Sequence, residues 1–338
     1  MFLSYFFRIF AELKHIDMAF NPDKFTGIIE NAISSIQYPS VAPLLFDPIR
    51  YTMESGGKRL RPTLTLAVYE ALSHRDASEA VNQALAIELF HNFTLLHDDV
   101  MDRADIRRGR PTVHCKWNDN VAILSGDTML TLASVCLCKG AGTHLAELSE
   151  CFNSTAMEVY EGQQLDMEFE SRNDVSVGEY MEMIRLKTSV LLAGACKLGA
   201  IMACASKEEC DRFYEYGEAL GLAFQLRDDW LDTFGDPAVF GKEIGGDIIN
   251  RKKTWLLITG LSEAPDELSS ILDEDLENDE LIRQVRRVYE RLHLDRRCNE
   301  LAEKYSLKAL ESLSNLNMDV DARKFFETLA RQASTRSH

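Results

Sequence analysis

Glycine and proline are scarce in this chain, and so are the alternating patterns that mark β-strands. Its 338 residues contain 18 glycines and 8 prolines, and no Asn-Gly pair signals a β-hairpin. With so few breakers, apolar residues recur at the helical period over long stretches, as in 81–96, 121–138 and 208–226. The sequence therefore predicts an all-α fold.

Positive charge and paired cysteines are also in short supply. The chain has 37 Lys and Arg against 54 Asp and Glu, a net charge of −17. Such a surface repels nucleic-acid phosphates, which excludes a general nucleic-acid-binding role.

The eight cysteines are scattered, without metal-site spacing, so we expect reduced core thiols in a cytoplasmic protein and no disulfides.

Long hydrophobic runs are missing from the N-terminus. Residues 1–10 are rich in aromatics but too short to span a membrane, and they lack the features of a cleaved signal. We expect no transmembrane segment. Residues 1–17 form either an additional helix or a stretch before the true translation start at Met18, which we favour, so the main domain covers 18–338. The acidic, polar stretch 264–280 predicts a mobile connection before the C-terminal helices.

What the chain does contain is one acidic pattern in two copies. These are Asp98-Asp99-x-x-Asp102 and Asp228-Asp229-x-x-Asp232, each after apolar residues. Residues i and i+4 lie on one helix face, about 6 Å apart, so each copy projects at least two carboxylates in one direction. Partly buried carboxylates need compensation, and Mg²⁺ with its preference for oxygen ligands and substrate phosphates supplies it. The repetition in apolar contexts favours metal sites over two solvated acidic patches.

Basic residues occur in two tight clusters. In 56–62, two glycines precede Lys58, Arg59 and Arg61, and in 105–112 Arg107 and Arg108 follow the first acidic motif. Guanidinium groups match phosphate geometry, although a basic surface turn or a salt-bridged helix end would give the same pattern.

Further polar residues extend these clusters. His91 lies seven residues before Asp98, within about 20° of the same helix face. Weaker signals of the same kind come from Gln163, Asp166, Lys187, Thr188, Lys242 and Lys252. Together these residues describe a cavity with carboxylates on two walls and cations around it, which suits Mg²⁺-bound diphosphates.

In this order the motifs resemble those of the trans-isoprenyl diphosphate synthases, the polyprenyl synthetase family, from about Tyr51 to Thr254. They are Gly-Gly-Lys-x-x-Arg-Pro, Asp-Asp-x-x-Asp, Arg-Arg-Gly-x-Pro-Thr, Gly-Gln-x-x-Asp, Lys-Thr, Gln-x-x-Asp-Asp-x-x-Asp and Gly-Lys. The resemblance implies the isoprenoid synthase fold, a large single-domain helical bundle around a central cavity. It also implies a homodimer and a Mg²⁺-dependent prenyltransferase that joins isopentenyl diphosphate to an allylic diphosphate.

The resemblance implies a role for each matching residue. About three Mg²⁺ ions would be bound by Asp98, Asp102 and Asp228, supported by Asp99, Asp229 and Asp232. The allylic diphosphate would be bound by Arg107, Lys187 and Lys242. Isopentenyl diphosphate would be bound by Lys58, Arg61, His91 and Arg108. Near the developing cation would lie Thr188 and Gln225, and beside the metals Gln163 and Asp166. Lys252 matches the family's last lysine, although the preceding Asn250-Arg251 departs from the common pattern.

Product length is predicted from residues before the first acidic motif. Phe93 lies five residues before Asp98, about 7.5 Å lower along a helix, with Thr94 and Phe90 nearby. These aromatics are either ordinary core or, as the resemblance favours, a floor beneath the growing chain. The floor implies geranylgeranyl diphosphate (C20), with farnesyl diphosphate second and a longer chain third. A class I terpene cyclase usually alters the second acidic motif, and a non-catalytic synthase subunit tends to lose such motifs; both motifs are intact here.

Overall fold

The computed structural model describes residues 20–235 and 244–334. The expectations for residues 1–17, for a start at Met18 and for Lys242 lie outside the described residues.

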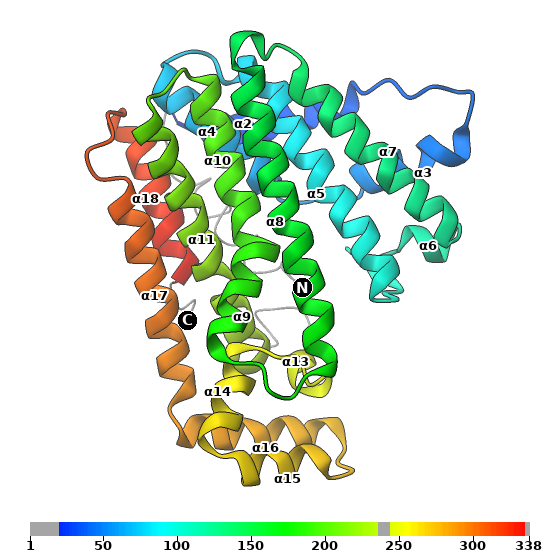
Figure 1. Ribbon diagram of the computed structural model, residues 1–338, viewed down its shortest axis with the longest axis vertical. Coiled ribbons are helices and arrows are strands. Elements are labelled where there is room, and N and C mark those ends of the chain that lie inside the picture. The colour runs from blue at the N-terminus through cyan, green and yellow to red at the C-terminus, as the bar shows by residue number, and fades with distance from the viewer. Residues whose placement is uncertain (1–19, 236–243, 335–338) are drawn as a thin grey trace.

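Helices make up most of the described chain, which confirms the all-α prediction (Figure 1). The first half comprises α2 (Pro22–Ser34), α3 (Pro43–Met53), α4 (Leu60–Ser73), η1 (Ala77–Ala80), α5 (Val81–Met101), α6 (Val113–Lys116), α7 (Asp119–Cys138), η2 (Gly142–His144) and α8 (Leu145–Ser171). Between α5 and α6, the antiparallel strands β1 (Ile106–Arg107) and β2 (Arg110–Pro111) form a short hairpin, which the sequence did not predict.

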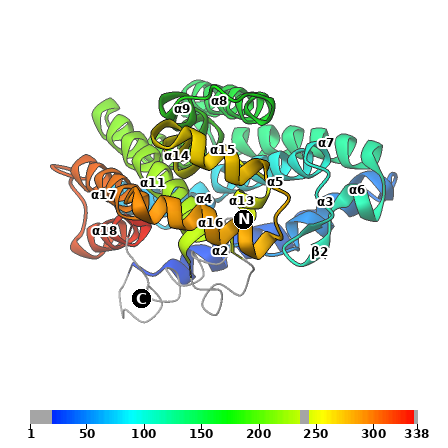
Figure 2. The same ribbon diagram turned by 90° about the horizontal axis from the view of Figure 1, so that it is seen from below.

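The second half continues as helices packed along the first. Its elements are α9 (Val177–Ile184), the π-helical turn η3 (Arg185–Ser189), α10 (Val190–Met202), α11 (Lys207–Phe234), α13 (Gly246–Ile249), α14 (Trp255–Glu263), α15 (Pro265–Asp273), α16 (Asn278–Arg291), α17 (Leu294–Ser312) and α18 (Val320–Ser334). Seen from below, α13 to α16 lie across the lower end of the long helices (Figure 2).

The three predicted helices are present and extend beyond the predicted ranges. α11 begins at a capping box, in which the Ser206 hydroxyl accepts the Glu209 N–H and the Glu209 carboxylate accepts the Ser206 N–H. α7 begins where the Asn118 side chain accepts the N–H of Val121 at 2.9 Å. These polar caps lie outside the apolar periodicity and account for the earlier starts of α7 and α11.

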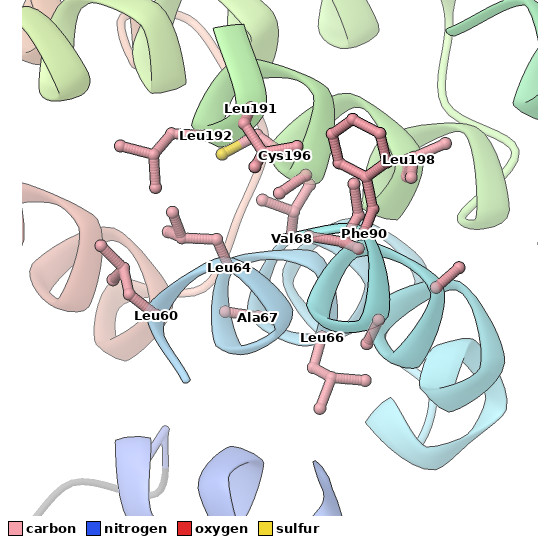
Figure 3. Close-up of a cluster of buried hydrophobic side chains, with 14 of the residues drawn as sticks. Leu60, Leu64, Leu66, Ala67, Val68, Phe90, Leu191, Leu192, Cys196 and Leu198 are labelled. Carbon is pink, nitrogen blue, oxygen red and sulfur yellow. The ribbon is translucent and has the colours of Figure 1, made fainter. Parts of the chain in front are cut away.

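The core is formed where α4 and α5 meet α10 (Figure 3). Leu64 and Val68 of α4 lie against Leu192 and Cys196 of α10, and these side chains are buried. A second buried cluster lies towards the lower end and joins α9, α14, α16 and α17. Each cluster includes a helix that carries an acidic motif, α5 in the first and α11, through Leu222 and Leu226, in the second. Core packing therefore fixes where those motifs lie.

The prediction of a mobile connection over 264–280 is wrong. Most of this stretch forms α15 and the start of α16, with Pro265 in the first turn of α15. Asp266 and Glu267 favour a helix N-terminus electrostatically, and Leu268 and Leu272 are buried at i, i+4 spacing. The stretch is polar because only one face of α15 is covered.

The prediction of core thiols holds for five cysteines and is wrong for three. All eight lie in the described residues as free thiols. The exposed ones are Cys115, Cys138 and Cys204.

Among the described helices, α7 is long and apolar enough to cross a membrane by length and composition alone. In this structure 39% of its apolar stretch is buried, chiefly against α5 and α3. Ile123, Leu124 and Val135 remain exposed on it. The helix therefore belongs to the bundle and leaves these three apolar side chains without cover in the described chain.

Gly199 tests the close packing of α10 against α4. A Cβ there would lie 2.3 Å from the backbone oxygen of Thr65. Because backbone cannot move aside cheaply, we expect Gly199→Ala to lower the free energy of unfolding by about 1–3 kcal/mol, measured by urea unfolding. Gly27 is the matched control, since it is exposed on α2 with nothing within 4 Å of an added Cβ. Gly27→Ala should stabilise by about 0.5–1 kcal/mol. A Gly199→Ala protein as stable as wild type would contradict this packing.

Candidate active site

The two acidic motifs lie at the C-terminal ends of two long helices. Asp98 and Asp99 are in the last turn of α5, and Asp102 is its C-terminal cap. Asp228 and Asp229 are in the last two turns of α11. Asp99 and Asp229 are buried, whereas Asp98 and Asp228 are half-buried and so remain partly open to a ligand.

Two cations meet the first motif. The Arg107 guanidinium, from β1, donates to Asp99 Oδ1 at 2.6 Å and reaches Asp98 Oδ2 at 3.5 Å. The Lys187 ammonium donates to Asp98 Oδ1 at 3.4 Å and to Asp166 Oδ2 at 2.5 Å. The structure therefore brings together predicted residues from the hairpin, α5, α8 and η3.

The second motif is held by neutral donors. The Tyr180 hydroxyl and the Gln225 amide both donate to Asp229, the amide at 3.0 Å to Oδ1. The backbone N–H of Asp247 donates to Asp232 Oδ2 at 2.8 Å. Asp229 and Asp232 are thus oriented by hydrogen bonds.

A π-helical turn joins the two motifs. Its residues Lys187 and Thr188 are adjacent; the first reaches Asp98, and the Thr188 hydroxyl donates to Gln225 Oε1 at 3.4 Å. The turn lies so close to α8 that a Cβ on Gly162 would be 2.2 Å from the Lys187 backbone nitrogen. Such turns interrupt α-helices most often at functional sites. Here the turn directs Lys187 towards the first acidic motif and Thr188 towards the second. Gly162 on α8 has no side chain, which allows the turn to pack this closely.

The carboxylates of both motifs have too little positive charge nearby to offset their own negative charge. Burial raises the pKa of Asp228 to about 7 and that of Asp229 to about 8, and Asp247 adds to both shifts. Partial desolvation, followed by repulsion from Asp98, raises the pKa of Asp102 to about 6. Hard cations that prefer oxygen ligands supply the missing positive charge at sites of this kind.

The residues present fit Mg²⁺ bound together with phosphate. Over residues 20–235 and 244–334, no group of three or more His, Cys, Asp or Glu side chains is spaced to hold a metal alone. Mg²⁺ usually takes one or two carboxylates and completes its shell with water and substrate phosphates. Asp98, Asp102 and Asp228 offer that kind of incomplete oxygen shell.

A cluster of cations forms the other side of the site. The Arg61 guanidinium contacts His91 Nε2 at 3.1 Å, and Arg108 donates to Ser55 Oγ at 3.1 Å and to the Gly56 carbonyl. Burial lowers the pKa of Arg61 to about 10. Burial, and then Arg61 and Arg108, hold the pKa of His91 well below its ordinary value. The buried Nε atoms of Arg61 and Arg108 have no hydrogen-bond partner within the described residues. Crowded cations with unused donors fit an anionic ligand.

Arg59, the third cation predicted for the first basic cluster, points elsewhere. Its side chain is 1% exposed and donates to Glu30 at 2.7 Å and to Glu88 at 2.6 Å. Its backbone is left-handed, with φ 49°, two residues after Gly57. Arg59 therefore pairs with acids inside the fold, and the signal missed in the sequence is the lone Glu88 in the apolar stretch of α5.

Three further predicted residues lie around the site. Lys252 faces Asp247 at 3.9 Å; burial lowers the pKa of Lys252, but Asp247 and neighbouring carboxylates raise it overall. Lys58 is half-buried in the loop before α4. Gln163 carries a buried amide nitrogen without a hydrogen-bond partner in the described chain.

The predicted product-length residues lie on α5, N-terminal to the first motif. Phe93 is 6% exposed and packs edge-to-face on Tyr160, with ring centroids 6.1 Å apart. Phe90, which Figure 3 shows in the core, is 1% exposed. Its ring contacts that of Phe152 of α8. The Thr94 hydroxyl donates to the carbonyl of His91 at 2.8 Å. Both rings are buried and both pack against α8, so the product-length roles of Phe90 and Phe93 stay predictions.

Sequence reasoning missed Tyr180, Asp247 and Gly162 as site residues. Tyr180 lies in α9 between Glu179 and Met181, and nothing in the local sequence marks its hydroxyl as the partner of Asp229. Asp247 follows Gly245 and Gly246, and nothing in the sequence distinguishes it from the other acidic residues. Gly162 stands in the Gly-Gln-x-x-Asp motif, but its close contact with η3 depends on tertiary packing.

Known proteins share this architecture and these motifs. Residues 42–292 match the family model of polyprenyl synthetase. The geranylgeranyl diphosphate synthase of Methanosarcina mazei is 42% identical over 65% of this chain and 68% of its own. The short chain isoprenyl diphosphate synthase of Methanothermobacter thermautotrophicus is 36% identical over 85% of this chain and 89% of its own. The crystal structure of geranylgeranyl pyrophosphate synthetase from Pyrococcus horikoshii has TM-score 0.88 and 31% identity, and covers 98% of this chain and 99% of that chain.

The fold, the motif order and these similarities define a prenyltransferase of the isoprenoid synthase fold. The chain belongs to the polyprenyl synthetase family. The fold and enzyme-class predictions are confirmed.

The raised pKa of Asp228 makes a prediction about pH. Its folded pKa of about 7 exceeds the ordinary 3.8, so the folded state keeps a proton that the unfolded state releases between these values. This group therefore destabilises the wild type progressively as the pH rises through that window. In EDTA, Asp228→Asn should match the wild-type free energy of unfolding near pH 4 and exceed it by on the order of 2 kcal/mol near pH 8. Paired urea melts at both pH values measure the difference, and a variant that loses relative stability as the pH rises would contradict it.

Proposed function

We propose that this protein condenses isopentenyl diphosphate with an allylic diphosphate and releases mainly geranylgeranyl diphosphate (C20). The π-helical turn carries the argument, because Lys187 and Thr188 join the two carboxylate walls at one place. The Arg61–Arg108 cluster supplies an anion site on the other side. Two substrates that each carry a diphosphate account for both features.

Each set of residues has a distinct task in this reaction. Asp98, Asp102 and Asp228 would hold Mg²⁺, which supplies positive charge to the diphosphate leaving group as the allylic carbon–oxygen bond breaks. Arg107 and Lys187 are placed to bind the same leaving group, since both already contact Asp98.

The remaining polar residues serve the second substrate and the cation. Arg61 and Arg108 would bind isopentenyl diphosphate through their unused guanidinium donors. Thr188 and Gln225 would direct oxygen dipoles at the developing carbocation, and apolar walls would exclude water that quenches it. The double bond of isopentenyl diphosphate would then attack the allylic cation to form the new carbon–carbon bond. The released diphosphate would take up the proton that is lost, which completes a five-carbon extension.

A C20 product is supported by the position of Phe93. Phe93 precedes Asp98 by about 7.5 Å along α5, and its ring packs against Tyr160 of α8. A chain that grows between α5 and α8 would meet this ring. The similarity to geranylgeranyl diphosphate synthases supports the same length.

A homodimer is supported by the exposed apolar face of α7, formed by Ile123, Leu124 and Val135. A second copy of the same face would remove this surface from water, as in other symmetric dimers. The free thiols fit a reducing cytoplasm.

Loss of one carboxylate from either acidic motif should strongly reduce turnover. We expect Asp98→Ala and Asp228→Ala each to lower kcat at least about 10²-fold, comparable to the loss of one electrostatic contact to the transition state. Excess EDTA should do the same to the wild type. Asp275→Ala, in the exposed loop between α15 and α16, is the control. Full activity in either site variant or in EDTA, measured with radiolabelled isopentenyl diphosphate, would reject the assignment; a cyclic hydrocarbon product would indicate a cyclase.

Phe93 should limit product length. We expect the wild type to release mainly C20 and Phe93→Ala to shift the products to longer chains, because removing the ring opens a path beyond it. Phe93→Tyr keeps the ring and should keep C20. Mass spectrometry of the products measures both. A wild-type C40 product would reject the length assignment, and an unchanged distribution in Phe93→Ala would reject the barrier.

A further inference from the structure

Tyr160 closes the space opposite Phe93 from a different helix. It lies on α8, and its ring centroid is 6.1 Å from that of Phe93 and 6.0 Å from that of Phe90. The Phe93 and Tyr160 rings meet at 88°, an edge-to-face arrangement. An opening between α5 and α8 at this level would require both rings to be displaced.

The depth of Tyr160 in the site follows from the Lys187 contacts. Lys187 binds Asp98 of α5 and Asp166 of α8 with one ammonium group, so these two carboxylates lie at the same level. Tyr160 precedes Asp166 by six residues, about 9 Å along α8, and Phe93 precedes Asp98 by five, about 7.5 Å along α5. The two rings, which are in contact, therefore form one layer at similar axial distances from the two carboxylates that Lys187 binds.

A third helix supports this layer through His97. The His97 ring lies edge-to-face on Phe93, with centroids 4.7 Å apart, and its Nε2 contacts the Ile123 carbonyl of α7 at 3.0 Å. Gly126 of α7 makes room for it, since a Cβ there would lie 2.3 Å from the same nitrogen. His97 therefore packs between Phe93 and α7.

We propose that Tyr160 is a second specificity-determining residue: together with Phe93, and with His97 as its support, it forms a barrier between α5 and α8 that stops chain growth. The inference rests on the proposed function, because it assigns part of the length control of that same reaction to α8. The proposed role of Tyr160 differs from that of a core residue. Phe90 is 1% exposed, whereas Tyr160 is 37% exposed, so truncation of Tyr160 leaves an open surface rather than a sealed void.

The test compares the full-length variants Tyr160→Ala, Tyr160→Phe and Phe93→Ala with the wild type. Met157→Ala is the matched control, since Met157 lies about one turn earlier on α8 and is 59% exposed. Each protein receives isopentenyl diphosphate and geranylgeranyl diphosphate as the allylic starter, and products are separated by mass spectrometry. We expect Tyr160→Ala to raise kcat/KM for extension of this C20 starter at least about 10-fold, the scale on which a hydrophobic pocket discriminates. Tyr160→Phe and Met157→Ala should behave as wild type.

The outcomes separate the two proposals. If Phe93→Ala extends the C20 starter and Tyr160→Ala does not, while both retain the wild-type rate with farnesyl diphosphate, the role of Tyr160 is overturned and the proposed function stands. If the wild type itself extends the C20 starter efficiently, the proposed product fails first. A melting temperature of Tyr160→Ala within a few degrees of wild type is expected, and a loss of folding with no product of any length would overturn the barrier in favour of a structural role.

Discussion

One ammonium group, that of Lys187, binds carboxylates on α5 and α8, and much of the site follows from this contact. It requires a π-helical turn, because the next residue, Thr188, must point to Gln225 on α11. The turn in turn requires glycine at 162, where any Cβ would meet the Lys187 backbone. The same contact sets α5 and α8 at one level, so aromatic rings at similar spacing before Asp98 and Asp166 meet in one layer.

Separation of charge is the second consequence of this arrangement. Burial raises the pKa of Asp228 and Asp229, and burial lowers the pKa of Arg61, so the acidic and basic walls are each costly to keep ionised. Residues optimised only for stability would pair these walls with each other. The arrangement instead leaves carboxylate oxygens for a divalent cation and guanidinium donors for a phosphate, which is stability given up for function.

The sequence predicts those parts of the site that depend on local spacing. The i, i+4 carboxylates and the basic residues beside glycines needed no tertiary information, and apolar periodicity was enough for α5, α7 and α11. The sequence could not predict that Arg59 pairs with Glu88 inside the fold. An Arg59 that faced the ligand site would have the same neighbours in the sequence. The helix α15 was missed because its covered face has only two buried leucines. Tyr180 and Tyr160 act on residues 49 and 67 positions away, which only the packing of helices brings together.

The central claim is that the acidic wall is completed by Mg²⁺ bound together with diphosphate. Metal ligands must lose their protons, so binding at a pH below the raised pKa of Asp228 and Asp229 has to release protons. Calorimetric titration of the full-length protein with Mg²⁺ and inorganic diphosphate near pH 6.5, in buffers of different ionisation enthalpy, measures that release. The account predicts tight binding only when both are present, with net proton release that shrinks in Asp228→Asn. Equally tight binding of diphosphate in EDTA, or binding without proton release, would contradict it.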